Sequence, residues 1–168
     1  RPVYADCSFD ALGFPAVDAE TWQKALADVA DNKDYYMQVY PLVVERLSRF
    51  NEIPSKIEFI FWGPNVVLDE KSVNKILKKD GARADEALAI CRGVLADEQN
   101  PWDAESLQEK CRALGEAAEI KPRNLFQPLR VAIAGNMVSP PLFEAIVMMD
   151  REDVLSRIDR VCNLVFGD

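Results

Sequence analysis

The sequence predicts an all-α fold built of amphipathic helices, because three observations agree. Apolar residues recur at steps of three and four in several segments, which is the period of a helix with one buried face. Alternating apolar and polar runs, which mark strands, are scarce. Capping residues bound the periodic segments. With 168 residues the chain is long enough to bury a core, as one domain or as two small helical ones.

Two helical segments are expected before residue 51. The first begins after Thr21, an N-cap residue, and the second covers residues 35–50, as one helix or as two that break at Pro41. A short apolar segment then ends at Gly63-Pro64, a strong stop. Its Phe-Ile-Phe run could form a strand by itself, but no neighbouring strand is available to pair with it. A subdomain boundary is therefore expected there, between residues 1–64 and residues 65–168.

Three helices are predicted between that boundary and residue 119. Residues 69–79 and 84–98 form two of them, divided at Asp80-Gly81, and Asp103 caps the third. The apolar residues of the third helix recur at steps of three and four: Leu107, Cys111, Leu114 and Ala118.

Three more helices follow, and a turn separates the first two. A long apolar helix starts at Pro122 and ends near Gly135, a C-cap residue. Ser139 then restarts a helix as its N-cap, with Pro140 at the first helical position, which proline favours. A final helix opens at Asp150 and carries one apolar stripe: Val154, Leu155, Ile158, Val161, Cys162 and Val165.

The composition removes most catalytic chemistry. The chain has no histidine, so most general acid–base schemes and Ser-His or Cys-His nucleophiles are absent. Its seven glycines are scattered and form no phosphate-binding loop. The four cysteines (Cys7, Cys91, Cys111 and Cys162) are widely spaced, so no zinc or other metal site is expected. Cys111 and Cys162 fall on apolar helix faces, as reduced core cysteines do in a cytosolic protein. No catalytic residue is predicted.

No membrane segment or secretory signal is expected. The longest charge-free stretch, residues 131–143, is far shorter than a membrane span, and no charged and apolar leader opens the chain. The sequence starts at Arg1 rather than Met, which suggests a piece of a longer protein. We therefore expect a cytoplasmic location.

The charge is uneven along the chain. The net charge of −8 argues weakly against a nucleic-acid partner, but local potential matters more than the total. Residues 71–83 carry five basic side chains and one acidic one, and residues 121–130 carry three basic and no acidic ones. Taken alone, the first of these stretches is better interpreted as a solvated helix face.

Arg130 stands out within the long apolar helix. It lies between Leu129 and Val131, with no acidic residue three or four positions away. A buried arginine without a partner costs roughly several kcal/mol, so its side chain should reach the surface or meet an anion. In a purely structural interpretation, Gly135 and Ser139 are helix caps and nothing more.

Three stretches of the sequence match one known family. The segment FQPLRVAIAGNMVSPPLFEAIVMMDREDVLSRIDR (residues 126–160) closely resembles the C-terminal anticodon-binding region of bacterial glutamyl-tRNA synthetases, which carries a PLR run followed by a Ser/Thr-Pro pair. The segment PLVVERLSRFNEIPSKIEFIF (residues 41–61) resembles an ER…FfF segment of that family. NPWDAESLQEKCRAL (residues 100–114) resembles the tryptophan-started helix between them.

The resemblance covers about residues 40–165, is strongest over 121–162 and is loose over 1–35. Two departures occur: Asp150-Arg151 stands where the family has Gly-Lys, and Ala134 stands where it has threonine. The resemblance implies an all-helical cage of two small subdomains, the anticodon-binding region of a class I aminoacyl-tRNA synthetase.

The family attaches glutamate to tRNA with ATP and Mg²⁺, in a catalytic half that carries HIGH-like and KMSKS-like signatures. Neither signature is present here, so this fragment alone is expected to need no cofactor and to be inactive. The resemblance implies the anticodon loop of glutamate tRNA as partner, and neither DNA nor a membrane. A monomer is expected.

The resemblance also implies individual site residues. Those that meet the anticodon are Arg46, Arg130, Ser139, Pro140 and Leu142, with Pro140 and Leu142 as an apolar surface for an unstacked base. Charge, rather than the resemblance, suggests further candidates for phosphate contacts: Arg49, Lys121, Arg123 and the basic residues of 71–83.

Arg46 matches the family arginine that inspects the third anticodon base, which is C in glutamate tRNAs and G in glutamine tRNAs. Cytosine presents two acceptors to the donor-only guanidinium, whereas guanine presents donors and would leave them unpaired, at a cost of roughly 1–3 kcal/mol. The hypothesis is therefore an enzyme that charges glutamate tRNA only. The alternative is that Arg46 pairs with Glu45 or Glu52 on a solvated helix. A rival function of another class is a non-catalytic, acidic helical scaffold for protein interactions.

Overall fold

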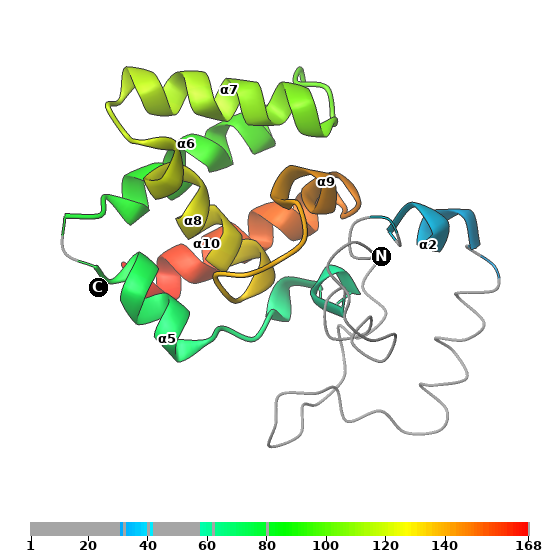
Figure 1. Cartoon of the computed structure of the whole chain (residues 1–168), viewed down its shortest axis with the longest axis horizontal. Coiled ribbons are helices and arrows are strands. Elements are labelled where there is room, and N and C mark those ends of the chain that lie inside the picture. The colour runs from blue at the N-terminus through cyan, green and yellow to red at the C-terminus, as the bar shows by residue number, and fades with distance from the viewer. Residues whose placement is uncertain are drawn as a thin grey trace.

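The computed structural model describes residues 31, 33–39, 41, 58–61, 63–79 and 81–167 (Figure 1). Every regular element among these residues is helical and none is a strand, which confirms the all-α prediction. No helix among them is both long and apolar enough to cross a membrane. The elements are α2 (Lys33–Val39), η2 (Glu58–Phe61), η3 (Gly63–Asn65), α5 (Glu70–Ser72), the π-helical η4 (Val73–Leu77), α6 (Ala84–Ala96), α7 (Ala104–Ala117), α8 (Pro122–Ala134), α9 (Leu142–Val147) and α10 (Arg151–Val165).

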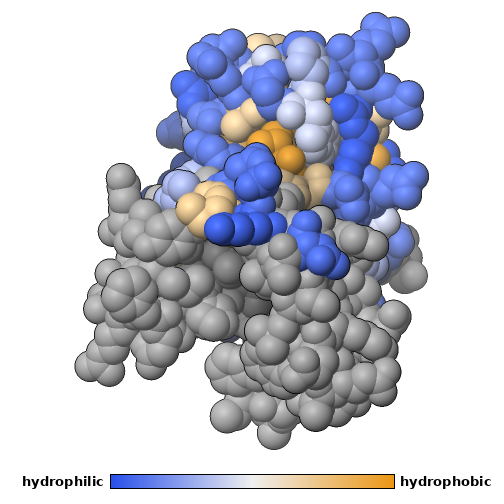
Figure 2. Space-filling model, turned by 90° about the vertical axis from the view of Figure 1, so that its right-hand side faces the viewer, coloured by the Kyte–Doolittle hydropathy of each residue, from blue (hydrophilic) through white to orange (hydrophobic). Residues whose placement is uncertain are grey.

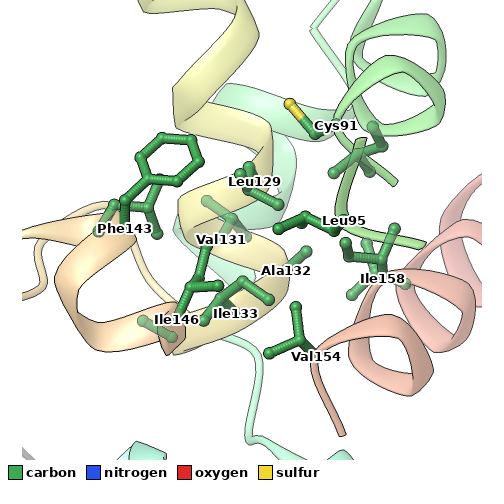
Figure 3. Close-up of a cluster of buried hydrophobic side chains, with 14 of the residues drawn as sticks. Cys91, Leu95, Leu129, Val131, Ala132, Ile133, Phe143, Ile146, Val154 and Ile158 are labelled. Carbon is green, nitrogen blue, oxygen red and sulfur yellow. The ribbon is translucent and has the colours of Figure 1, made fainter. Parts of the chain in front are cut away.

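Helices α6, α8 and α10 pack against one another and enclose the core of the described region. Fully buried side chains from all three meet at their centre, as Figure 3 shows: Leu95, Leu129, Ala132, Ile133, Val154 and Ile158. Helix α7 lies across α6 and α8, and it also contacts α9. Helix α8 is therefore a central element of the described region, since it contacts α6, α7, α10, η2 and η4.

Several local signals for helix ends after residue 69 agree with the structure, and the one at Ser139 does not. The Asp69 carboxylate accepts a hydrogen bond from Ser72 N at 2.8 Å, and the Asp103 carboxylate accepts one from Ser106 N at 2.9 Å. The hydrogen bonds from Ser72 and Ser106 lower the pKa of both carboxyls, since they favour the charged form. Gly135 ends α8 in the left-handed conformation, and α10 begins after Asp150. The predicted helix after Thr21 lies outside the described residues.

Ser139 is not the N-cap of the next helix, and that prediction was wrong. Helix α9 begins at Leu142, with Pro141 at the N-cap and no side-chain cap. The first reason is that a residue before proline avoids the helical region, so Pro140 cannot start a helix ahead of Pro141. The second is that the Ser139 hydroxyl is already engaged, since it accepts a hydrogen bond from Arg130 and donates one to Pro140 O at 3.0 Å.

The predicted apolar face of α7 is also only partly correct. Leu107 and Cys111 are fully buried, but Leu114 is 51% exposed. Gly115 is buried in its place, against Leu125 of α8. A Cβ on Gly115 would lie 2.5 Å from Leu125 Cδ2, so the missing side chain is what lets the two helices approach.

Hydrophilic residues cover most of the described surface in the view of Figure 2, around a small hydrophobic area. The large apolar side chains that are exposed in the described region are spread over several elements: Met37, Val67, Leu114, Val138 and Leu164. Isolated exposed apolar side chains are ordinary in soluble proteins.

Replacing Gly135 by alanine should destabilise the fold by roughly 1–3 kcal/mol. Gly135 has a φ of 78°, and an added Cβ would lie 2.0 Å from Val67 O, which is backbone and cannot move away cheaply. Gly93→Ala is the matched control, because Gly93 lies inside α6 with nothing within 4 Å of an added Cβ. Urea unfolding of both variants measures the difference. Equal midpoints would show that the turn at Gly135 is not constrained as described.

Stability should fall in acid partly through the ion pair that joins α6 to α10. Arg92 donates to both carboxylate oxygens of Asp159, at 2.5 and 2.8 Å, and this contact lowers the pKa of Asp159. A carboxyl with a lowered folded pKa contributes stability above its unfolded pKa of about 3.9 and loses it as pH falls through the folded value. Both side chains are more than one-third exposed, so the contribution is about 0.2–1 kcal/mol.

Arg92→Met should therefore lower stability at pH 7 by that amount and leave it nearly unchanged below the folded pKa of Asp159. Unfolding by urea across pH 2–7 measures both ends of this curve. The same loss at every pH would contradict the assignment of this ion pair.

Candidate functional site

The connection between α8 and α9 brings three of the predicted site residues into direct contact: Arg130, Ser139 and Pro140. Arg130 lies in α8 and is half-buried. Its Nη1 donates to the Ser139 hydroxyl, to Ser139 O at 3.2 Å and to Pro140 O at 3.0 Å. One nitrogen of the guanidinium thus fixes the conformation of the Ser-Pro segment. This contact explains in part why the apolar helix contains an arginine, because the guanidinium has hydrogen-bond acceptors in the Ser-Pro segment.

The side chains of Pro140 and Leu142 are both buried, Leu142 with 5% of its surface exposed. Val138, which precedes Ser139, is instead 73% exposed. Val138 is therefore the most exposed apolar side chain of this connection, and Met137 and Pro141 are partly exposed. Val138 was not among the predicted site residues, because neither its residue type nor its spacing distinguishes it. Binding roles for Pro140 and Leu142 remain predictions.

Two hydrogen bonds hold this connection against α5 and the residue that caps it. Asp69 N donates to Gly135 O at 2.8 Å, and Met137 N donates to the Ser72 hydroxyl at 3.2 Å. Within the turn itself, Val138 N donates to Asn136 Oδ1 at 2.8 Å. The turn is therefore braced from both sides, which reduces the conformational freedom that a ligand would have to remove.

Two arginines of α10 donate hydrogen bonds to backbone carbonyls of the same region. Arg157 is fully buried, and its Nη1 donates to Ile133 O at 2.8 Å, near the end of α8. Arg160 donates to Val66 O at 2.8 Å, in the segment that braces the turn. Both contacts satisfy carbonyls outside regular hydrogen bonding, as arginine donors often do near helix ends.

Arg157 is a buried cation whose electrostatic compensation is incomplete. Its nearest carboxylate is Asp153, at 3.5 Å from Nη2, and Nε and Nη2 have no hydrogen-bond partner in the described structure. Burial lowers the pKa of Arg157 to about 10, so the group stays charged at neutral pH. Burial also raises the pKa of Asp153, and Arg157 offsets that effect only in part. The spacing held a signal for this burial, since Arg157 falls three after Val154 and four before Val161.

Arg151, which departs from the family pattern, braces the connection between α6 and α7. Its guanidinium donates to Asp97 O at 2.7 Å and to Asn100 O at 3.2 Å. The same group lies 4.6 Å from the centre of the Trp102 ring, within the range of a cation–π contact. Arg151 thus links the first turn of α10 to the connection between α6 and α7.

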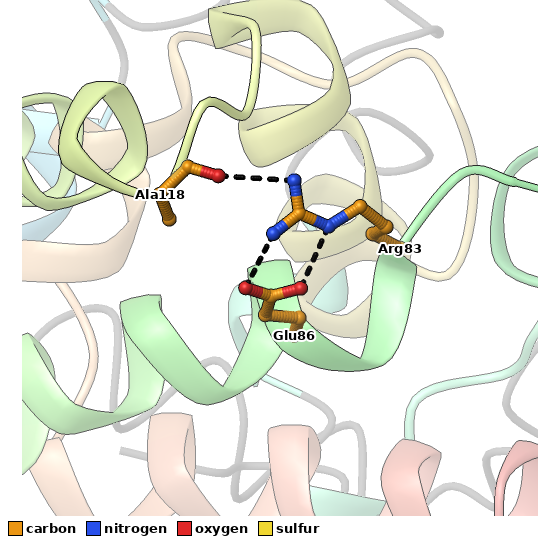
Figure 4. A network of polar contacts seen from close by, with 3 residues as sticks. All are labelled: Arg83, Glu86 and Ala118. Carbon is orange, nitrogen blue, oxygen red and sulfur yellow. Dashed lines mark hydrogen bonds and ion pairs between the residues drawn. The ribbon is translucent and has the colours of Figure 1, made fainter.

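The structure describes some of the residues predicted to contact phosphates and not others. Lys121 and Arg123 are exposed at the start of α8, whereas Arg49 lies outside the described residues. Arg46, which was predicted to contact the anticodon, also lies outside them. Arg83, at the end of the first basic stretch, is engaged in the network of Figure 4. It donates to both carboxylate oxygens of Glu86, at 2.6 and 2.7 Å, and to Ala118 O at 3.0 Å.

The two buried cysteines of the described core lie close to each other in α6 and α7. Cys91 and Cys111 are free and buried, and a hydrogen bond between them together with burial raises the pKa of the Cys91 thiol. A thiol with a raised pKa is a poor nucleophile at neutral pH. Within the described residues, no three His, Cys, Asp or Glu side chains gather as a metal site requires.

Comparison with known proteins supplies a family. The model of a family described as an anticodon binding domain matches residues 17–162. Glutamate–tRNA ligase from Clavibacter michiganensis is 34% identical over 129 residues, which are 76% of this chain and 25% of the relative. The ligase of the same name from Roseiflexus castenholzii is 32% identical over 140 residues, 80% of this chain and 26% of the relative.

Solved structures agree in fold. A glutamate tRNA ligase from Elizabethkingia meningosepticum, solved in complex with its amino acid, superposes with a TM-score of 0.68 at 20% identity, over 85% of this chain and 28% of that one. A glutamate–tRNA synthetase from Elizabethkingia anophelis gives a TM-score of 0.63 at 19% identity, over 92% of this chain and 34% of that one. The chain thus spans about a quarter of the length of the two relatives above.

Proposed function

This chain belongs to the anticodon-binding domain family, and we propose that it binds the anticodon loop of glutamate tRNA within a glutamate–tRNA ligase. The observation that carries the proposal is the contact between Arg130 and Ser139, in the segment that most resembles the family. It places a guanidinium, a hydroxyl and the exposed Val138 on one connection between two helices.

These groups suit an RNA loop. Proteins recognise RNA sequence where bases are unstacked and offer their pairing edges to side-chain donors and their faces to apolar contacts. Arg130 brings several donors in a fixed plane, and Val138 brings an apolar contact. Ser139, Pro140 and Leu142 shape the turn that presents them, and further contact of these three with the anticodon rests on the family resemblance.

Titration of this chain against two RNAs tests the proposal. One is a glutamate tRNA transcript, and the second is the same transcript with the anticodon loop replaced by a short unrelated loop. Binding should be tighter to the intact tRNA, since base contacts add to the phosphate contacts that both RNAs share. Equal affinity for the two would remove the anticodon loop from the site, and no binding to either would favour the scaffold of protein interactions.

Discrimination at the third anticodon base is a separate part of the proposal and rests on Arg46. Transcripts with C or G at that base should bind with different affinities, by roughly 5- to 150-fold if unpaired donors cost about 1–3 kcal/mol. The preference for C should disappear in Arg46→Ala. If wild type binds both transcripts equally, the enzyme does not discriminate through Arg46.

The remaining expectations concern the intact protein. A catalytic half would supply ATP, Mg²⁺ and glutamate binding, and the ligase would act in the cytoplasm as a monomer. Within this chain, two small helical subdomains would meet near residue 64. Limited proteolysis would test that boundary, because linkers between subdomains are cleaved ahead of packed helices.

A further inference from the structure

A basic pocket opens at the N-terminal end of α8, separate from the contact between Arg130 and Ser139. It has a volume of about 370 Å³, and three of its lining residues are Lys75, Lys79 and Arg123. All three basic side chains are exposed. The described residues that line the pocket include no carboxylate. The packing of η4 against α8 thus joins two basic stretches that lie more than forty residues apart in the sequence.

The local charge of this pocket is opposite to that of the chain. The chain has a net charge of −8, yet three cationic groups surround one depression. The first turn of α8 contains no acidic residue, and its backbone N–H groups add partial positive charge at the same end. Anions are attracted by such a local potential whatever the net charge.

The pocket and the anticodon site lie along one face of α8. Arg123, Gln127 and Arg130 follow each other at steps of four and three, the spacing of one helix face. Gln127 lines the pocket, so this stripe leads from the pocket to Arg130. Seven residues of helix separate Arg123 from Arg130, or about 10 Å at 1.5 Å per residue. A loop of RNA seated at Arg130 is long enough to bring its backbone over this distance.

We propose that Lys75, Lys79 and Arg123 bind backbone phosphates of the same RNA whose anticodon loop contacts Arg130. This inference rests on the proposed function. Long, exposed basic side chains suit phosphates, which position an RNA without reporting its sequence. The pocket should therefore strengthen binding of C-ending and G-ending anticodons equally, and it should make binding dependent on salt.

A pair of triple variants tests the pocket. The pocket variant is Lys75→Gln/Lys79→Gln/Arg123→Gln. The control, Lys71→Gln/Lys78→Gln/Arg112→Gln, removes the same charge from exposed side chains that do not line the pocket. Affinity for glutamate tRNA is measured for both and for wild type from about 50 to about 200 mM salt, the range over which phosphate contacts weaken strongly. Equal unfolding midpoints establish that all three proteins are folded.

The pocket variant should reduce the magnitude of the slope of log affinity against log salt by about 2, because each of three lost phosphate contacts contributes roughly 0.7. The control should change the slope much less. If wild type binds the tRNA and the two triple variants behave alike, the pocket is not an RNA contact. Inorganic phosphate is also added to the wild-type chain, and the amide chemical shifts of Arg123 and Gln127 are followed. If phosphate shifts these amides while the pocket variant keeps the wild-type salt slope for tRNA, the pocket binds a free anion and the inference is overturned. If wild type does not bind tRNA, the proposed function itself fails.

Discussion

Arg157→Ala should destabilise the chain by about 3–5 kcal/mol, the usual cost of removing one partner from a buried charge pair. The variant leaves Ile133 O without its donor and leaves Asp153 without its nearest cation. It also empties the volume of a side chain that is fully buried. Urea unfolding at neutral pH, followed by circular dichroism, measures the loss.

Two further variants separate charge from volume. Arg157→Met keeps most of the volume but leaves Asp153 unpaired, so it should remain strongly destabilised. Arg157→Met/Asp153→Leu removes both charges, and apolar replacements of buried ion pairs are often neutral or stabilising. The double variant should therefore be more stable than Arg157→Met alone. A double variant that is less stable than the single one would mean that the Asp153 carboxylate stabilises the fold independently of Arg157.

Arg130→Ala should weaken binding to glutamate tRNA by roughly 10- to 100-fold, because hydrogen bonds to a charged group contribute about 1.5–3 kcal/mol. Two effects combine in this variant. The RNA loses a donor, and the turn loses the contacts that hold Ser139 and Pro140 in place. The same titration of glutamate tRNA that tests the proposed function provides the measurement.

Ser139→Ala separates the two effects, because it removes the hydroxyl that accepts from Arg130 and leaves the arginine itself in place. If Arg130 contacts RNA, Ser139→Ala should weaken binding less than Arg130→Ala does. Arg112→Ala, at an exposed position of α7, controls for the loss of one positive charge. Binding by Arg130→Ala at the affinity of the Arg112 control would contradict a role for Arg130 in RNA recognition.

Local chemistry made the helices after residue 69 predictable. Asp69 and Asp103 cap their helices through their own side chains, and Gly135 ends α8 because its left-handed conformation suits glycine. Such signals involve residues a few positions apart, so a sequence displays them directly. The family resemblance rested on a similarly continuous stretch, and the match of the family model over residues 17–162 agrees with it.

Tertiary contacts decided the features that sequence patterns left open. Ser139 has the residue type of an N-cap, but Arg130, nine positions earlier, engages its hydroxyl. Leu114 continues the apolar spacing of α7, yet Gly115 faces α8 instead. Arg157 has the i, i+4 partner of a surface ion pair but is enclosed by α8 and α10. The outcomes at Ser139 and Leu114 depend on which helix packs on which, and a single sequence does not contain that information. The burial of Arg157 is the exception, because its spacing from Val154 and Val161 indicates it.

The most direct test of the central claim is to map which backbone amides change when RNA binds. An ¹⁵N-labelled sample of this chain would be titrated with the anticodon stem-loop of glutamate tRNA and followed by amide chemical shifts. The largest shifts should fall on the connection between α8 and α9, from Gly135 to Ser139, and at Arg130. Shifts confined to the outer surface of α7, with the amides of that connection unchanged, would contradict the placement of the anticodon loop at this site.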